Sequence, residues 1–520
     1  MQTNKTNDLV KGALLLTVAG IISKMLSAAY RIPLQNLTGD IGFYIYQQVY
    51  PILGMTLVLA LYGFPSAVAR LAVTVERDRT KVSLTHFVLP LFFLLVIING
   101  LIAFILWKNA DRLAYFVGDG QLAPIFEKVS LVFLLIPFTA LLRGVFQSQL
   151  HMQPIAFSQV SEQIVRVFII LATAILYSSG KLTSIYKIGE WATYAALLAG
   201  SIAVIVLLIF LIKDKPFTKE SFSIPWKKYM YAIIVLGFVA SLNHMILLLI
   251  QLADTLTLIP ALQNFGLAKN EAMVAKGVFD RGQPLIQLGT VIGSSFALTL
   301  IPEATKTDHV STRSLTETMT FSFYLATGAT TGLFLIFPET NLLLYKDLSG
   351  TFSLQILSLA IILSTMSVTA IAVLQGAGVI IRTAVYILLA FIVKSISNIF
   401  LVPLLGITGS ALATVFSLLC LTILVFIELL KKFPLQVFWQ QLRWKPLTKA
   451  VLTMIFYIVM FKYVTPVTLL ESRLFLLGYV VFIVISGSFV FLLVLVRNRA
   501  LTLDQMAALP FSRFFINFYK

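Results

Sequence analysis

The stretch LPLFFLLVIINGLIAFIL at residues 89–106 determines the fold class of this chain. It is apolar on every side when coiled into a helix, and its length approaches the ~20 residues that cross a ~30 Å hydrocarbon core. A transmembrane β-strand needs only ~10 residues, and these alternate between apolar and polar, as this stretch does not. Because lipid offers no partner to backbone N–H and C=O groups, a bundle of spanning helices is the remaining architecture. The sequence therefore predicts an all-α integral membrane protein.

Runs of the same kind recur along the 520 residues, of which 59% are hydrophobic and 12% are charged. The connecting loops are too short to hold an enzymatic domain, so we expect a protein that is not an enzyme. Reading apolar runs between polar breaks predicts about 14 transmembrane helices, near residues 12–35, 42–66, 84–107, 124–146, 154–178, 190–212, 229–255, 274–301, 317–338, 353–375, 379–401, 405–430, 447–465 and 473–496.

Basic residues gather in the loops that face the cytoplasm if the N-terminus lies inside. The formal net charge is +17, but the Lys and Arg residues are spread over several loops, so nucleic-acid binding is not expected. An excess of Lys and Arg on cytoplasmic loops sets orientation, which predicts a multi-pass protein of a bacterial plasma membrane with both termini in the cytoplasm. This prediction depends on Arg70, Arg77, Arg79, Lys81, Lys213, Lys215, Lys219, Lys227, Lys228, Lys431, Lys432, Arg443, Lys445, Lys449, Arg497, Arg499, Arg513 and Lys520.

Two pairs of short segments indicate an internal repeat. QQVYPILGM around Pro51 resembles DRGQPLIQLG around Pro284, and LLRGVFQSQ at Gly144 resembles AVLQGAGVI at Gly376. Both pairs have nearly the same offset, which favours duplication, although short apolar matches also arise by chance. The repeat predicts two pseudo-symmetric six-helix lobes, with the substrate site in a central cavity between them. The predicted division is residues 1–215, residues 216–432, and residues 433–520 with two further helices and a cytoplasmic tail.

Charges at membrane depth are costly, so those present are expected to face protein or a water-filled cavity. Lys24, Ser27 and Arg31 follow one another at spacings of three and four, which places them on one face of the first predicted helix. We expect Lys24, Arg31 and Arg281 to bind an anion, because guanidinium groups donate two hydrogen bonds at once to phosphate. Polar residues predicted to line the cavity or to take part in ion coupling are Gln47, Gln48, Asn243, Gln251, Asp254 and Asp280.

Structural explanations compete with this hypothesis. Arg281 can pair internally with Asp280 or Asp254, and Lys24 or Arg31 can extend to a membrane interface. Glu162 and Arg166 lie four residues apart, which favours a local salt bridge.

Motifs for covalent or nucleotide chemistry are missing from the sequence. We find no Gly-rich phosphate loop, nucleophile elbow or pair of His ligands at helical spacing, so neither catalytic nor metal-binding residues are predicted. The single cysteine, Cys420, lies in an apolar run and is expected to be a small buried side chain. No cofactor is expected, and membrane potential, protons or sodium remain open as driving forces.

Three segments carry a resemblance to a known family. They are KGALLLTVAGIISKMLSAAYRIPLQNLTGDIGFYIYQQVYPIL at 11–53, YGFPSAVARLAV at 62–73 and LLGITGSALATV at 404–415. The chain resembles the polysaccharide-flippase branch of the MOP exporter superfamily, which contains lipid II flippases. The resemblance implies two lobes, a cationic cavity and export of an undecaprenyl-pyrophosphate-linked saccharide from the inner to the outer leaflet. Arg31 is the position that matches a family arginine in helix 1.

The chain departs from the lipid II flippases at several positions. Those proteins carry an acidic residue beside the helix 1 arginine, whereas here its neighbours are Tyr30 and Ile32. They also have an aspartate early in helix 2, where this chain has Gly42, and their helix 8 Arg/Glu pair is matched only approximately by Asp280 and Arg281. The saccharide and the physiological stage therefore stay open.

Three functions were weighed. The first is a flippase for lipid-linked cell-wall precursors, acting as a monomer with its lipid substrate and membrane lipids as partners. The alternative is a MATE-type cation-coupled multidrug exporter, whose usual substrates prefer an acidic, aromatic cavity to Lys24 and Arg31. A membrane-embedded glycosyltransferase ranks last, because it normally needs a large loop or a carboxylate and metal constellation.

Overall fold

The computed structural model describes residues 2–75, 81–218, 223–304, 312–433, 438, 442–466, 472–507 and 514. Among the basic residues that predict orientation, Arg77, Arg79, Lys219, Arg513 and Lys520 lie outside this part of the chain. The described residues form two compact units, Met1–Asp280 and Arg281–Lys520. The repeat-based boundary at residue 216 stays a prediction.

The first unit is almost entirely helical, with η1, η2 and η5 as π-helical segments and η3 and η4 as 3₁₀ segments. Its elements are α1 (Gln2–Ala29), α2 (Arg31–Val58), η1 (Leu59–Gly63), α3 (Phe64–Val75), β1 (Val82–Ser83), η2 (Leu84–Val88), α4 (Leu89–Lys108), α5 (Ala110–Val117), η3 (Gly120–Leu122), α6 (Ala123–Ser130), η4 (Leu131–Leu135), α7 (Ile136–Ser148), α8 (Gln153–Ser178), α9 (Lys187–Asp214), β2 (Phe217–Thr218), α10 (Trp226–Tyr231), η5 (Ala232–Val239), α11 (Ala240–Leu242), α12 (Ile246–Asn264) and α13 (Lys269–Asp280).

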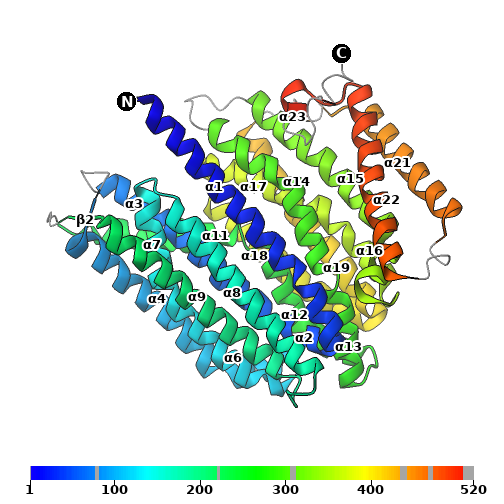
Figure 1. Cartoon of the computed structure of the whole chain (residues 1–520), viewed down its shortest axis with the longest axis horizontal. Coiled ribbons are helices and arrows are strands. Elements are labelled where there is room, and N and C mark those ends of the chain that lie inside the picture. The colour runs from blue at the N-terminus through cyan, green and yellow to red at the C-terminus, as the bar shows by residue number, and fades with distance from the viewer. Residues whose placement is uncertain are drawn as a thin grey trace. The chain divides into compact units, whose positions relative to one another are not determined.

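Within this unit, α8 and α9 run side by side, and α1 packs on α8 (Figure 1). The helices α12 and α13 pack on α2, while α3 packs on α7 and η5. The two short strands β1 and β2 pair in parallel, which ties the segment before α4 to the segment after α9.

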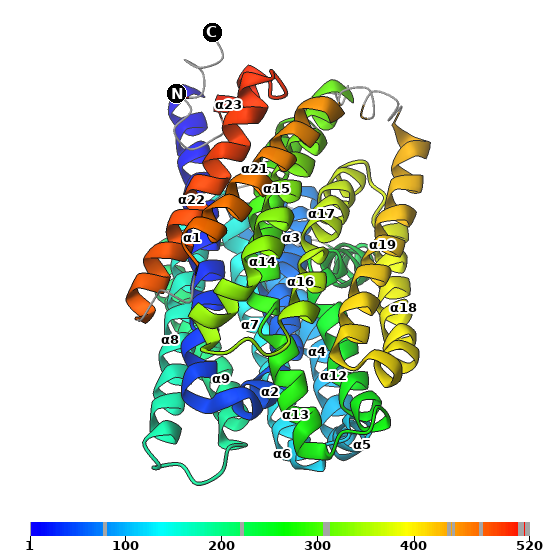
Figure 2. The ribbon, with the colours of Figure 1, turned by 90° about the vertical axis from the view of Figure 1, so that its right-hand side faces the viewer.

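The second unit is helical throughout its described residues. Figure 2 shows α18 beside α19, and α21 beside α22. Both α21 and α22 also contact α15. Its elements are α14 (Gln283–Ala304), α15 (Thr312–Tyr345), α16 (Thr351–Ser358), α17 (Ala360–Gly376), α18 (Ile381–Leu405), α19 (Ile407–Lys432), α21 (Trp444–Val464), α22 (Arg473–Arg497) and α23 (Leu503–Ala507).

The prediction of an all-α membrane protein is confirmed. Among the described residues, 12 helical segments are long and apolar enough to cross a membrane. The first of these, Val18–Val75, is 58 residues long and covers most of the predicted span 12–35 and all of the span 42–66, so the count of 14 remains a prediction.

Three of the predicted spans are not continuous helices. The predicted span 12–35 is interrupted at Tyr30, three residues before Pro33, whose ring nitrogen cannot donate to the preceding turn. Helix α2 then bends at Gly39, which has φ 67° and ψ −175°. The predicted span 229–255 breaks between α11 and α12, and 274–301 breaks between α13 and α14.

Candidate functional site

Four charged side chains form a buried group in the first unit, which we call the Asp254/Asp280 cluster: Arg31 on α2, Asp254 on α12, and Lys276 and Asp280 on α13. Each is at most 3% exposed. Lys276 Nζ lies 2.7 Å from Asp280 Oδ2, and Asp280 also interacts electrostatically with Arg31 and Asp254. Two cations and two carboxylates therefore balance each other, which makes burial tolerable.

Arg31 sits on an aromatic platform. Its guanidinium carbon lies 3.8 Å from the ring centroid of Tyr50, a cation–π geometry, and the side chain is fully buried. The hydroxyls of Tyr30 and Tyr46 are hydrogen-bonded to each other, and their rings pack edge to face at 5.9 Å. These tyrosines belong to an apolar core that is built from α2, α8 and α9. Stacking on the Tyr50 ring restricts the orientation of the planar guanidinium.

Buried amides accompany this cluster. Gln47 and Gln48 on α2, Gln251 on α12, and Asn243 at the break before α12 are all at most 5% exposed. Within the described residues, Gln47 Oε1, both amide atoms of Gln251 and Asn243 Oδ1 have no hydrogen-bond partner. Buried polar atoms are normally paired, so these positions indicate contacts with water, a ligand or another conformation.

Helix α13 approaches α2 unusually closely. A Cβ atom added to Gly277 would lie 2.2 Å from the backbone oxygen of Asp40 and 2.8 Å from its carbonyl carbon. Only glycine allows the two backbones to meet at this distance. This contact holds Lys276 and Asp280 against the helix that carries Arg31.

The predicted cationic stripe of helix 1 is divided between two environments. Lys24 on α1 has an exposed side chain, whereas Arg31 at the start of α2 is fully buried. Tyr30, between the two helices, keeps helical backbone angles (φ −68°, ψ −20°), so the two side chains differ in exposure because of what packs around each of them.

Arg281, the third predicted anion ligand, belongs to the second unit and is held there by an ion pair. Its Nη1 lies 2.7 Å from Asp347 Oδ1 and its Nη2 lies 3.0 Å from Oδ2, a bidentate geometry. The Tyr345 hydroxyl donates to the Arg281 carbonyl oxygen at 2.9 Å. Internal pairing of Arg281 was foreseen, but the carboxylate in this pair comes from Asp347 rather than from Asp280 or Asp254.

Asp119 is a further buried carboxylate, and the sequence analysis did not single it out. It contacts Tyr44, Tyr186 and Lys269, and we call these four residues the Asp119 cluster. Asp119 is fully buried and accepts hydrogen bonds from Lys269 Nζ at 2.8 Å, Tyr186 at 2.8 Å and Tyr44 at 3.3 Å. Burial and the hydrogen bond to Asp119 raise the pKa of Tyr186. The cluster ties the start of α13 to α2 and to the residues just before η3 and α9.

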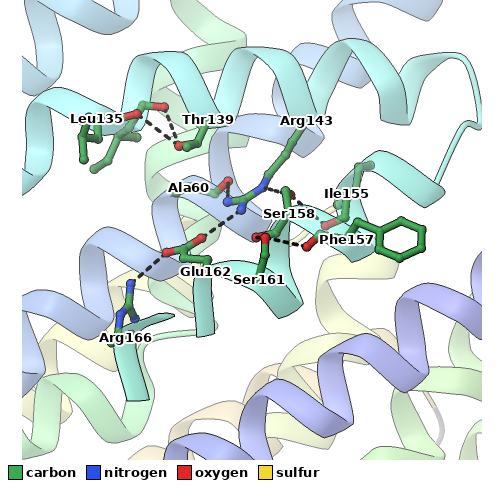
Figure 3. A network of polar contacts seen from close by, with 11 residues as sticks. Ala60, Leu135, Thr139, Arg143, Ile155, Phe157, Ser158, Ser161, Glu162 and Arg166 are labelled. Atoms are coloured by element: carbon green, nitrogen blue, oxygen red, sulfur yellow. Dashed lines mark hydrogen bonds and ion pairs between the residues drawn. The ribbon is translucent and has the colours of Figure 1, made fainter. Parts of the chain in front are cut away.

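The Glu162–Arg166 salt bridge is confirmed, with 2.8 Å between Glu162 Oε1 and Arg166 Nη2. Figure 3 shows that Glu162 also pairs with Arg143, which the sequence analysis missed, at 2.9 Å between Oε2 and Nη2. Among the described residues, no group of three or more His, Cys, Asp or Glu side chains could hold a metal ion.

The model of a family described as polysaccharide biosynthesis protein matches residues 9–308 of this chain. The chain belongs to this family. Within the MOP exporter superfamily, it falls in the polysaccharide-flippase branch, as its N-terminal motif predicts.

Two curated relatives from Bacillus subtilis (strain 168) match most of this polysaccharide biosynthesis family member. This chain is 37% identical to the "uncharacterized membrane protein YabM" over 414 residues, which are 78% of this chain and 76% of the relative. It is 26% identical to "lipid II flippase MurJ" over 442 residues, 79% and 80% of the two chains. A solved MurJ structure in an inward closed conformation has a TM-score of 0.62 at 13% identity, covering 92% of this chain and 98% of that chain. That likeness shows a shared fold.

In this family member, the ion pair between Lys269 and Asp119 is expected to stabilise the packing of α13. Lys269→Met should lower the free energy of unfolding by about 1–3 kcal/mol, because it leaves a buried carboxylate without its cation. In an Asp119→Asn background, the same change should cost far less. Unfolding of the four proteins of this double-mutant cycle in detergent gives the coupling energy, and a coupling near zero would contradict the assignment.

The Arg281–Asp347 pair makes a prediction about pH. Asp347 is partly buried, which raises its pKa, but hydrogen bonds from Arg281 and the Ser349 backbone N–H outweigh this and lower the pKa below its ordinary value. A carboxyl with a lowered pKa in the folded state stabilises the fold above its unfolded pKa of ~3.9 and loses that contribution as pH falls.

Asp347→Asn should therefore lower the unfolding temperature at pH 7. The difference in unfolding temperature between wild type and variant should become smaller below about pH 4. The measurement is thermal unfolding of wild type and variant across this range, with the exposed Asp111→Asn as the control. An Asp347→Asn effect that is independent of pH would argue against a role for the carboxylate charge.

Proposed function

We propose that this protein is a flippase that moves undecaprenyl-pyrophosphate-linked saccharides, lipid II or related cell-wall units, from the inner to the outer leaflet. The observation that carries the proposal is Arg31, which is fully buried on the Tyr50 ring and interacts electrostatically with Asp280 on α13. The relative named lipid II flippase matches about four fifths of both chains, which supports the same substrate class. We further propose that the chain transports rather than catalyses.

In this proposal the pyrophosphate replaces the internal carboxylates as the partner of Arg31 and Lys276. A planar guanidinium can donate two charge-assisted hydrogen bonds to a phosphate group. The unpartnered amides of Gln47 and Gln251 provide further polar groups for the head of the substrate. The polyprenyl tail stays in lipid, so only the head needs a polar path.

Alternating access then requires α13 to separate from α2. With both termini in the cytoplasm, as the basic loops predict, the Asp119 cluster and the Gly277–Asp40 contact lie at the outer end of the bundle. We propose that these contacts close the outer side while the substrate enters from the inside. Opening them would expose the Asp254/Asp280 cluster to the outer leaflet.

The alternative, a MATE-type exporter of organic cations, draws on the same cluster. Asp254 and Asp280 are buried carboxylates, the groups that such a substrate would need. Asp280 is paired with Lys276 and also interacts with Arg31, however, so a cationic substrate would have to displace Lys276 there.

One experiment separates the two functions. Proteoliposomes that hold the purified chain are tested for flipping of lipid II, flipping of other undecaprenyl-pyrophosphate saccharides, and transport of organic cations. Flipping of at least one pyrophosphate lipid, without cation transport, is the expected result. Transport of organic cations with no flipping of any lipid would instead establish the exporter.

A further inference from the structure

The triad Arg143, Glu162 and Arg166 is a second charged group, distinct from the Asp254/Asp280 cluster, and it lies between α7 and α8. All three side chains are at most 10% exposed. Arg143 uses every arm of its guanidinium: Nε donates to Ser158 Oγ at 3.1 Å, Nη1 to the Ala60 carbonyl at 3.2 Å, and Nη2 to Glu162 at 2.9 Å (Figure 3). Each of its three side-chain nitrogens therefore has a hydrogen-bond partner.

Arg166 is bonded less completely. It shares Glu162 with Arg143 through one bond from Nη2 at 2.8 Å. Within the part of the chain that the structure describes, its buried Nε atom has no hydrogen-bond partner. An unpaired donor on a guanidinium buried at membrane depth is costly, so a partner is expected in the functioning protein.

A cavity lies next to this donor. It has a volume of about 20 Å³ and is lined by Arg166 and Glu162 from α8 together with residues of α2, η1, η4, α7 and α9. Apart from Arg166 and Glu162, the lining residues are uncharged, and they include the hydroxyl groups of Thr56 and Thr139. Small side chains at Ala60, Ala196 and Gly200 leave the space open.

The charge of the triad decides what this cavity can hold. Two arginines and one glutamate leave a net charge of +1, because the single carboxylate is shared by both guanidinium groups. A bound cation would raise the local charge to +2, and so would protonation of Glu162. A monovalent anion would bring it to zero, which is the favourable outcome in a low-dielectric interior.

We propose that this cavity binds a small monovalent inorganic anion, of halide size, held by Arg166 Nε. The cavity is smaller than the sites that enclose drug-sized ligands, so it excludes a lipid-linked saccharide. A single ion of halide size fits, since about 10–15 Å³ of cavity volume is enough to hold one water. The site is assigned from the triad and its cavity alone.

The test is thermal unfolding of the purified full chain in detergent. Sodium gluconate is exchanged stepwise for sodium chloride or sodium bromide at constant sodium concentration. The wild type should show a saturable rise in unfolding temperature, because a ligand that binds the folded state stabilises it. Arg166→Gln should lose the saturable rise, whereas Arg112→Gln, which changes an exposed arginine on α5, should keep it.

Glu162→Gln distinguishes an anion site from a proton or cation site. Removing the negative charge should lower the halide concentration at half effect by about tenfold or more, equivalent to about 1.4 kcal/mol of relieved repulsion. A cation site would lose its response in this variant. If Glu162→Gln does not fold without halide, its recovery on adding bromide supports the same conclusion.

Bromide also allows a direct observation. Anomalous scattering from crystals of the full chain grown in bromide should give a peak beside Arg166 Nε in the wild type and none in Arg166→Gln. Absence of a saturable halide response, an equal response in Arg166→Gln, or absence of the bromide peak would each overturn the proposal.

Discussion

Arg31→Ala is expected to abolish flipping of the transported lipid, while the amount of protein in the membrane stays near that of wild type. Two charge-assisted hydrogen bonds to a pyrophosphate contribute roughly 1.5–3 kcal/mol each, so their loss predicts a fall in flipping rate of at least about a hundredfold. The rate is measured in proteoliposomes with whichever lipid the wild type moves, and complementation of a flippase-deficient strain provides a second measure.

Controls are needed because Arg31 is fully buried within the Asp254/Asp280 cluster and interacts with Asp280. Arg31→Ala leaves Asp254 and Asp280 facing Lys276 alone, and the excess negative charge lowers the stability of this packing. The double variant Arg31→Ala/Asp254→Asn restores the charge balance and should recover the unfolding temperature without recovering flipping. Wild-type flipping by Arg31→Ala, or recovery of flipping in the double variant, would remove Arg31 from the substrate site.

Arg31→Lys tests whether flipping needs a planar guanidinium or only a positive charge at this position. Lysine keeps the charge but lacks the planar fork that donates two parallel hydrogen bonds and stacks on Tyr50. Flipping by this variant should fall between that of wild type and that of Arg31→Ala.

Gly277→Ala is expected to force α13 away from α2. The new Cβ would lie 2.2 Å from the Asp40 carbonyl oxygen, which is backbone and cannot move aside as a flexible side chain would. Overpacking of this kind costs roughly 1–3 kcal/mol, enough to reduce the population of this closed packing by about fivefold or more. Flipping should fall, because the outer side no longer closes while substrate enters from the inside.

Cysteine labelling measures this opening directly. In a Cys420→Ala background, Met273→Cys places a thiol at a buried position of α13. A membrane-impermeant maleimide added outside should label it faster when Gly277→Ala is also present. The matched control is Gly100→Ala on α4, where an added Cβ meets no atom within 4 Å. Equal labelling with and without Gly277→Ala would contradict the proposed outer closure.

Local properties of the sequence determined the fold class and one ion pair. Hydropathy is a sum over neighbouring residues, so a run such as 89–106 specifies a membrane helix without reference to the rest of the chain. The pair Glu162–Arg166 could be predicted for the same reason, since residues four apart meet on any helix. The N-terminal motif likewise indicated the family to which the chain belongs.

Only the tertiary structure decided which charges are neutralised, because their partners are distant in sequence. Asp119 meets Lys269 across 150 residues, and Arg281 meets Asp347 across 66. Lys24 is exposed and Arg31 is buried, although their spacing predicted a single face. Helical spacing describes one helix at a time, whereas the partner of a buried charge depends on which helices pack together.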